Sequence, residues 1–225
     1  MNRRLKHGFP GDNSGQGYSM VHVITPFSRF ENLNFYLKNY ADKGIIWHPL
    51  VTPQEGEYFA SSYPDWVRPY ILPRVPADRN IVKYKINMFL IDGNINDYDR
   101  YMILMDDDFI EPDFFTKLEA IQDDIVVCSM KRGQHYLGGH PIETLVASPD
   151  MHVGTIGFEQ YILRGKILQQ IRFRSDSDLS TGYPPHRQGD SDGHAYEMMA
   201  KLWPIKYVPD LYVYFNYLEK GRWDI

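Results

Sequence analysis

Five apolar residues in a row, Tyr101 to Met105, constrain the fold more than any other feature of the sequence. A strand that faces water on one side alternates apolar and polar residues, whereas an unbroken apolar run indicates a strand buried on both faces. Strands of that kind belong to parallel sheets covered by helices on both sides. The run therefore predicts an α/β fold with a mostly parallel central sheet flanked by helices.

The rest of the chain supplies the strands and helices that such a sheet needs. Compact apolar runs predict further strands at Val21–Thr25, Ile45–Val51, Val67–Leu72, Ile125–Met130 and Lys206–Asn216, the last interrupted by Pro209. Apolar residues at helical spacing predict helices at Leu33–Tyr40, Val82–Leu90, Phe114–Ile121 and Gly193–Leu202, and a strand followed by a helix is expected within Val153–Phe173. The β-α-β-α-β order of the first half predicts parallel strands joined by right-handed crossovers.

Length and composition fit one domain with a substantial core. The chain has 225 residues, of which 43% are hydrophobic, and this suits a single α/β domain. Residues 1–19 are rich in Gly, Asn, Ser and Gln, which predicts a flexible N-terminal arm or an added leader. The folded domain is therefore expected to cover residues 20–225.

Charge and cysteine usage exclude several classes of protein. The formal net charge of −5 argues against a general nucleic-acid binder, which would carry a basic excess. The one cysteine, Cys128, rules out an intramolecular disulfide and a cysteine-based zinc site. It fits a reducing compartment, so a cytoplasmic location is expected, with peripheral contact to a membrane left open. No apolar run approaches the roughly 20 residues of a bilayer-spanning helix, and the N-terminus lacks the apolar core of a signal peptide.

Three consecutive carboxylates, Asp106, Asp107 and Asp108, directly follow the most apolar strand. Ligands of open α/β sheets bind outside the carboxyl ends of the strands. Adjacent carboxylates repel one another, so they need a compensating cation or full solvation. Carboxylate oxygens suit Mg²⁺ or Mn²⁺, and Mg²⁺ completes its shell with water and substrate phosphates. The triplet therefore predicts a site for a divalent metal and a diphosphate.

These features together resemble the GT-A fold glycosyltransferases, especially those of the broad family 2 type. Tyr101–Ile110 looks like the DxD region of that family, and Val21–Phe27 resembles its first strand. Further blocks of likeness are Arg79–Asn80 with Lys83–Asn87, Gly154–Gly157 with Arg164–Gly165, and Ser191–Asp192 followed by Lys206–Pro209. The resemblance covers about residues 20 to 216, and the order and spacing of the blocks carry it.

The resemblance implies a fold, a reaction and its cofactor. The fold would be a single GT-A, or Rossmann-like, domain with a nucleotide-binding half at 20–130 and an acceptor half at 131–225. The reaction would move a sugar from a UDP- or GDP-sugar donor to an acceptor hydroxyl, with inversion, and would depend on Mn²⁺ or Mg²⁺. The acceptor, whether a glycan, a lipid-linked molecule or a protein, is left open.

The resemblance also assigns roles to particular residues. Asp106 and Asp108 are the expected metal ligands. The expected nucleotide-binding residues are Thr25, Pro26, Phe27, Arg29, Arg79, Lys83, Asp106 and Asp107. The general base that removes the acceptor proton would be Asp192, with Asp190 as second choice, although Ser191 stands where the family usually has Glu.

Two other functions stay open. A sugar nucleotidyltransferase would share the α/β frame and the metal, but such enzymes usually carry a Gly-rich phosphate loop after the first strand, and Thr25–Arg29 contains no glycine. The other function is a catalytically silent module that binds sugar nucleotides. It would be favoured if Asp192→Asn left all measurable activity unchanged. The family's frequent late histidine is also missing, because no histidine follows His194.

Overall fold

A nine-stranded sheet runs through the part of the chain that the computed structural model describes, which is residues 19–59, 63–73, 81–132, 143–171, 173, 191–215 and 217–218. Its strands are β1 Val21–Pro26, β2 Ile45–Val51, β3 Tyr70–Ile71, β4 Arg100–Ile103, β5 Phe109–Ile110, β6 Ile125–Arg132, β7 Glu143–Leu145, β8 Tyr161–Arg164 and β9 Lys206–Phe215. The order across the sheet is β3-β2-β1-β4-β8-β6-β9-β5, and β7 pairs with β6.

The sheet is mostly parallel, as predicted. β1, β2, β3 and β4 pair in parallel, as do β6 and β9. β8 lies antiparallel to both β4 and β6, so those two strands point the same way. Among the nine described strands, β5, β7 and β8 run in the opposite direction. The carboxyl ends of β1, β2, β4, β6 and β9 therefore meet at one edge of the sheet.

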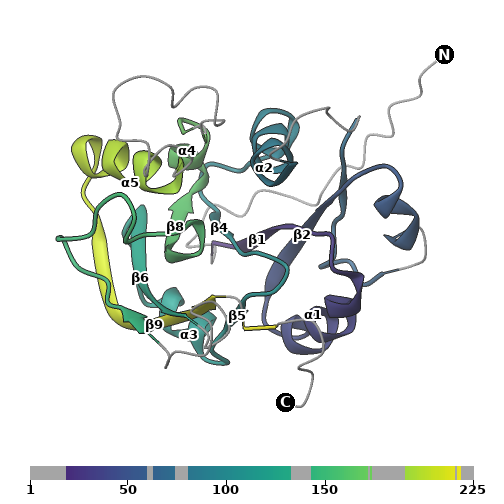
Figure 1. Ribbon diagram of the computed structural model, residues 1–225, viewed down its shortest axis with the longest axis horizontal. Helices are drawn as coiled ribbons and strands as arrows, with labels where there is room; N and C mark the ends of the chain where they lie inside the picture. Colours follow the sequence, from purple (N-terminus) through teal and green to yellow (C-terminus); the bar gives the residue numbers. More distant parts are fainter. Residues whose placement is uncertain are drawn as a thin grey trace.

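Helices cover both faces, which makes three layers (Figure 1). The helices are α1 Leu33–Tyr40, α2 Ile81–Asp92, α3 Phe114–Glu119, α4 Gly165–Leu168 and α5 Ser191–Leu202, with single 3-10 turns at Phe30–Asn32, Glu55–Phe59 and Phe158–Gln160. α1 and α3 pack on one face, and α2, α4 and α5 pack on the other. No helix in the described part of the chain has both the length and the apolar character of a bilayer-spanning segment.

Alternation along β1 explains the two cores. All six residues of β1 are buried, as a strand covered on both faces requires. Val23 packs into the core under α1 and α3, whereas Ile24 packs into the core under α2 and α5. Successive side chains of a strand point to opposite faces, so each apolar residue of β1 serves one core or the other. In the first core, Tyr36 stacks on Trp47 with ring centroids 5.2 Å apart.

The predicted elements agree with the structure closely in the first half and less closely later. The strand expected at Val67–Leu72 is only β3, with an isolated parallel bridge between Val67 and Trp47. β8 separates β4 from β6, an arrangement that the β-α-β-α-β pattern did not predict. The interruption expected at Pro209 is present as a register shift of β9 between Cys128 and Ser129 of β6. The predicted arm, apart from residue 19, lies outside the described residues.

Candidate functional site

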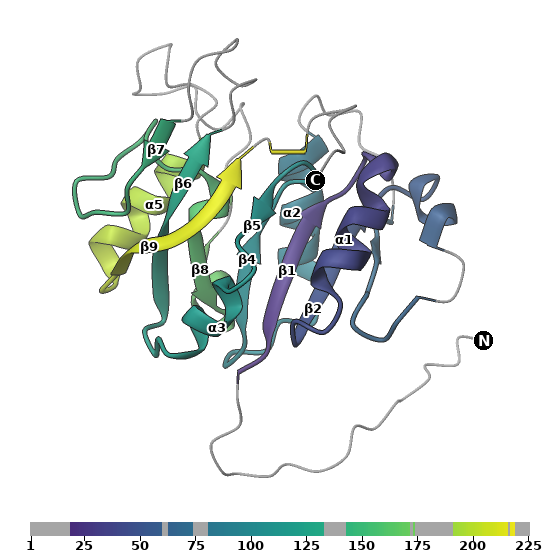
Figure 2. The ribbon, with the colours of Figure 1, turned by 90° about the horizontal axis from the view of Figure 1, so that it is seen from below.

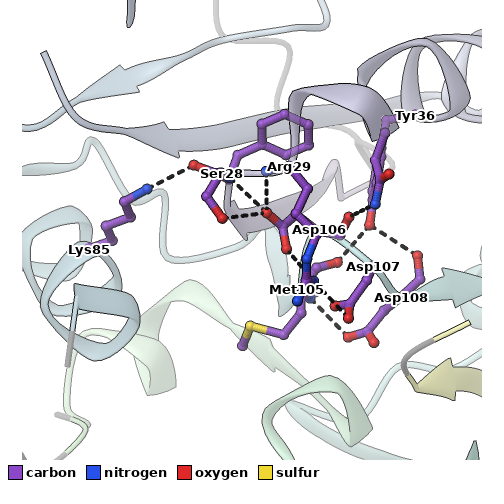
Figure 3. A network of polar contacts seen from close by, with 10 residues as sticks. Ser28, Arg29, Tyr36, Lys85, Met105, Asp106, Asp107 and Asp108 are labelled. Carbon is purple, nitrogen blue, oxygen red and sulfur yellow. Dashed lines mark hydrogen bonds and ion pairs between the residues drawn. The ribbon is translucent and has the colours of Figure 1, made fainter. Parts of the chain in front are cut away.

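The acidic triplet forms a tight turn at the carboxyl edge of the sheet, immediately after β4 (Figure 3). The Asp108 amide donates to the Met105 carbonyl at 3.2 Å. The Asp108 carboxylate in turn accepts a hydrogen bond from the Met105 amide at 3.0 Å. Asp108 is fully buried. Its carboxylate therefore fixes the backbone of the turn.

Asp106 is held by the loop that follows β1. Its Oδ2 accepts hydrogen bonds from the Ser28 amide at 2.7 Å, the Ser28 hydroxyl at 2.9 Å and the Arg29 amide at 2.8 Å. Its Oδ1 accepts from the Arg29 guanidinium at 2.9 Å. These charge-assisted bonds join two loops that are 77 and 78 residues apart in sequence. Asp106 thus ties the end of β4 to the end of β1.

Arg29 bridges two of the three carboxylates. Its Nη1 lies 2.9 Å from Asp106 Oδ1 and 2.7 Å from Asp107 Oδ2 (Figure 3). Burial acts to lower the pKa of Arg29, but the negative charges of Asp107 and Asp106 outweigh it and raise the pKa. Burial raises the pKa of Asp107; Arg29 acts against that rise and Asp106 adds to it. The guanidinium therefore supplies part of the compensating positive charge that the sequence led us to expect from a metal.

Further contacts hold the turn from the α1 side and from the C-terminal segment. The Tyr36 hydroxyl of α1 lies 2.6 Å from the Met105 carbonyl and 3.0 Å from the Asp108 carbonyl. The Leu218 amide donates to the Asp107 carbonyl at 2.7 Å. The C-terminal segment therefore reaches the triplet.

The nucleotide contacts predicted around β1 fall into two groups. Arg29 is exposed at the site, whereas the side chains of Thr25, Pro26 and Phe27 are buried. Thr25 accepts a hydrogen bond from the Trp47 indole at 3.0 Å, and Phe27 packs in the first core. The side chains of those three residues support the loop from below, and their roles as nucleotide contacts stay predictions.

Two lysines of α2 are buried. Lys83, a predicted nucleotide contact, is buried. Lys85, which the sequence analysis missed, donates to the Phe27 carbonyl at 2.8 Å and pairs with Glu55 at 2.9 Å. It thereby holds the loop after β1 against α2. Arg79 lies outside the described residues.

The predicted base, Asp192, occupies the first turn of α5 and is half-buried. Its carbonyl accepts a hydrogen bond from the Tyr161 hydroxyl of β8 at 3.4 Å. Gly193 follows it, and a Cβ at that position would lie 2.5 Å from Val153 Cα, so the helix begins in close contact with the 153 segment. Asp190, the second choice, lies outside the described residues.

Glu159 is a buried carboxyl that sequence reasoning did not find. It lies in the 3-10 turn Phe158–Gln160, and its Oε2 is 2.5 Å from where a Cβ on Gly157 would sit. Burial raises the pKa of Glu159 to about 8, and the charges of Asp192 and Asp107 contribute to the rise. Glu159 therefore interacts electrostatically with both the predicted base and the triplet. The signal in the sequence was weak: an acidic residue between Phe158 and Gln160, a few residues before the apolar run Tyr161–Leu163.

The side chains present fit a divalent metal only in part. Both carboxylate oxygens of Asp106 already accept hydrogen bonds, and Asp108 is buried with one oxygen turned to the Met105 amide. No group of three or more His, Cys, Asp or Glu side chains among the described residues could hold a metal ion by itself. Asp107 is the carboxylate that best fits such a role, together with phosphate oxygens that a substrate would bring. The ligand roles of Asp106 and Asp108 stay predictions.

Comparisons with known proteins add little to this geometry. No protein-family model matches the chain, and no curated protein matches it either. Among solved structures, the chain is similar to one described as the crystal structure of 4-diphosphocytidyl-2C-methyl-D-erythritol synthase. The TM-score is 0.44 and the identity 9%, over 86% of this chain and 90% of that chain. Likeness at this level carries no argument about activity, so the assignment of an α/β fold rests on the sheet and helices described above.

Proposed function

We propose that the chain is a glycosyltransferase that takes a sugar from a UDP- or GDP-sugar donor. One observation carries the proposal: Asp106, Asp107 and Asp108 stand at the carboxyl edge of β4, joined through Arg29 to the end of the neighbouring β1. Ligands of α/β sheets bind outside this edge. The diphosphate would lie over Arg29 and Asp107, and the acceptor would approach from the side of α5.

The reaction would be an inverting displacement. The acceptor hydroxyl oxygen attacks the anomeric carbon, and a carbon–oxygen bond forms as the bond to the diphosphate breaks. The electron pair of that bond leaves with the diphosphate oxygen, and the acceptor proton passes to the Asp192 carboxylate. The electrostatic interaction of Glu159 with both Asp192 and Asp107 supports a common site for the base and the triplet.

A divalent cation, Mn²⁺ or Mg²⁺, belongs to the proposal because of the charge at this edge. Arg29 is already paired with two carboxylates, so an incoming diphosphate would add negative charge beside Asp106, Asp107 and Asp108. Asp107 would hold the cation with the phosphate oxygens. A bound cation would stabilise the charge of the departing diphosphate.

A sugar nucleotidyltransferase is the second candidate, and one observation weighs against it. In such enzymes the loop after the first strand usually binds phosphate. Here the amides of Ser28 and Arg29 donate to Asp106, at 2.7 and 2.8 Å, and are engaged within the protein. The likeness to the solved 4-diphosphocytidyl-2C-methyl-D-erythritol synthase is too weak to favour either reaction.

The test is a panel of UDP- and GDP-sugars and nucleoside triphosphates, each with and without Mn²⁺. Thermal unfolding would measure binding, because a ligand of the native state raises its stability by mass action. We expect stabilisation by one nucleotide sugar with Mn²⁺ and slow release of nucleoside diphosphate. Arg29→Gln and Asp107→Asn should weaken that stabilisation. The matched control is Asp113→Asn, which changes an exposed aspartate at the start of α3 and should leave the stabilisation by the nucleotide sugar unchanged.

Each other outcome has a distinct meaning. Release of pyrophosphate from a triphosphate and a sugar phosphate would establish the nucleotidyltransferase instead. Binding without turnover, unaffected by Asp192→Asn, would indicate the silent sugar-nucleotide-binding module. No stabilisation by any nucleotide would remove the central claim.

A further inference from the structure

A cleft of about 730 Å³ lies at the amino edge of the sheet, opposite the triplet. Its lining includes Val21, which begins β1, Arg100, which begins β4, and Arg164, which ends the antiparallel β8. Figure 2 shows β1, β4 and β6 starting together at this edge, with α3 beside them. Asp106 lies six residues beyond Arg100, about 20 Å away along an extended strand. The cleft is therefore separate from the candidate active site.

Arg100 is the unusual residue of the cleft, because its guanidinium is buried with a donor left over. The residue is 2% exposed. Its Nη2 donates to the Ile121 carbonyl, whereas its buried Nη1 has no hydrogen-bond partner among the residues that the structure describes. A buried charged donor without a partner lowers the stability of the folded chain, because its lost hydration is not replaced. Such a group marks a place where an acceptor would bind favourably.

Three of the neighbouring carboxylates, Asp97, Asp99 and Asp124, are already committed to other partners. Asp99 accepts from the Met20 amide at 3.0 Å and from His22 at 3.3 Å. Asp124 pairs with Lys166 at 2.7 Å, and Asp97 accepts from Gln169 at 2.9 Å. None of these hydrogen bonds and ion pairs involves the Arg100 guanidinium.

A second arginine adds positive charge to the same cleft. Arg164 Nη1 donates to the Tyr98 carbonyl at 2.6 Å, which fixes its guanidinium near the cleft. Burial lowers the pKa of Arg100 to about 10; the charge of Arg164 adds to that effect, and the charges of Asp123 and Asp124 oppose it. On the α3 side the lining combines apolar Phe115, Leu118 and Ile121 with polar Glu119 and Gln122. The cleft therefore combines two guanidinium groups with a cluster of apolar side chains.

We propose that this cleft binds a small oxyanion with a compact apolar body, held by Arg100 and Arg164. A carboxylate or a phosphate ester presents two oxygens to the planar guanidinium fork, and this geometry gives the stronger charge-assisted hydrogen bonds. The apolar body would pack on Phe115 and Leu118. The proposal does not rest on the transferase activity.

The experiment titrates the full chain with sodium benzoate, as the carboxylate probe, and with sodium phosphate, as the phosphate probe. Thermal unfolding is followed at constant ionic strength, balanced with sodium chloride. Phosphate also stabilises proteins generally through exclusion from their surface, but that effect does not saturate. We expect a saturable rise in the unfolding temperature with at least one probe.

Variants show whether a saturable rise in the unfolding temperature comes from the cleft at the amino edge of the sheet or from the triplet at the carboxyl edge. Arg164→Gln and Arg100→Gln should weaken the apparent affinity by at least about tenfold, since each removes a charge-assisted contact. Arg68→Gln, an exposed arginine elsewhere, is the matched control and should leave the affinity unchanged. Arg29→Gln should also leave it unchanged, which separates this cleft from the diphosphate site.

The remaining results also decide the matter. If Arg100→Gln does not fold, Arg164→Gln and ligand-observed NMR of benzoate with the unaltered chain supply the same comparison. An absence of saturation with both probes would overturn the proposal. So would equal affinity in Arg164→Gln, or a phosphate effect that disappears only in Arg29→Gln.

Discussion

At the scale of single residues, Glu159 links pH to stability. Its carboxyl is buried, and its pKa in the folded chain is about 8, against an ordinary value of 4.5. Between these values the folded chain binds a proton that the unfolded chain has released. The stabilising contribution is therefore complete below about pH 4.5 and is lost as the pH rises through 8.

We expect Glu159→Gln to reduce this loss, because glutamine carries no charge to desolvate. The unfolding temperature of the variant should fall less between pH 6 and pH 9 than that of the unaltered chain. Glu57→Gln, an exposed glutamate in the 3-10 turn Glu55–Phe59, is the control and should keep the original pH dependence. Identical pH profiles for Glu159→Gln and the unaltered chain would contradict the burial argument.

Neighbouring carboxylates of the triplet should respond differently to the same substitution. In Asp106→Asn an amide nitrogen would face donors from Ser28 and Arg29, so we expect a loss of about 2 kcal/mol in the free energy of unfolding. Asp107→Asn removes one ion pair, with Arg29, where Asp106 accepts four hydrogen bonds, and should lower stability less while weakening nucleotide binding. Urea unfolding with and without nucleotide measures both effects. Equal losses of stability would show that the two carboxylates share one structural role.

At the scale of elements, the start of α5 depends on a close approach to the 153 segment. Alanine is normally favoured over glycine inside a helix by about 1 kcal/mol. At Gly193, however, a Cβ would lie 2.5 Å from Val153 Cα, a distance that backbone atoms cannot accept. We therefore expect Gly193→Ala to lower both stability and turnover, because α5 and Asp192 must shift together. Lys201→Ala, an exposed position on the same helix, should change neither, and chemical unfolding with an activity assay compares them.

Helices and strands with strong periodicity could be predicted from the sequence. The order and direction of the strands within the sheet could not. The range of β2 agrees with the prediction residue for residue, because its apolar run is unbroken apart from one histidine and one proline. α1 covers the four apolar residues that recur at helical spacing, and it ends at Tyr40, before the expected stop at Gly44. The insertion of β8 between β4 and β6 left no such trace, since periodicity reports burial and not strand direction. β5 has only two residues, too few to show alternation.

The same limit applies to the candidate site. The triplet stood out because it followed an unbroken apolar strand. The pairing of the triplet with Arg29 could not be predicted, because Arg29 is 77 residues away from Asp106 in the sequence. Glu159 was missed for a related reason: it precedes the antiparallel β8, whereas residues of parallel strands reach this edge after the strand.

At the scale of the whole molecule, the net charge of −5 sets the conditions for binding an anionic nucleotide. Since the described residues do not form a complete metal site alone, we expect Mn²⁺ to bind weakly without nucleotide and much more tightly with UDP. Isothermal titration of Mn²⁺ in the presence and absence of UDP measures the difference. Equal affinities would mean that the cation and the diphosphate do not share a site. Asp113→Asn again serves as the control.

The two-residue strands at the ends of the sheet order bear on how the protein behaves at high concentration. β3 and β5 are too short to offer another chain a row of free backbone groups. β5 pairs with only two residues of β9, so the rest of the outer edge of β9 has no partner strand in the described sheet. That edge carries the exposed charges of Lys206 and Asp210, and Pro209 between them has no backbone N–H to donate. Open sheets with long apolar edges grow into fibrils by adding strands. Because its edge strands are short and the free part of β9 is charged, we expect this sheet to resist the addition of strands from other chains when the protein is concentrated.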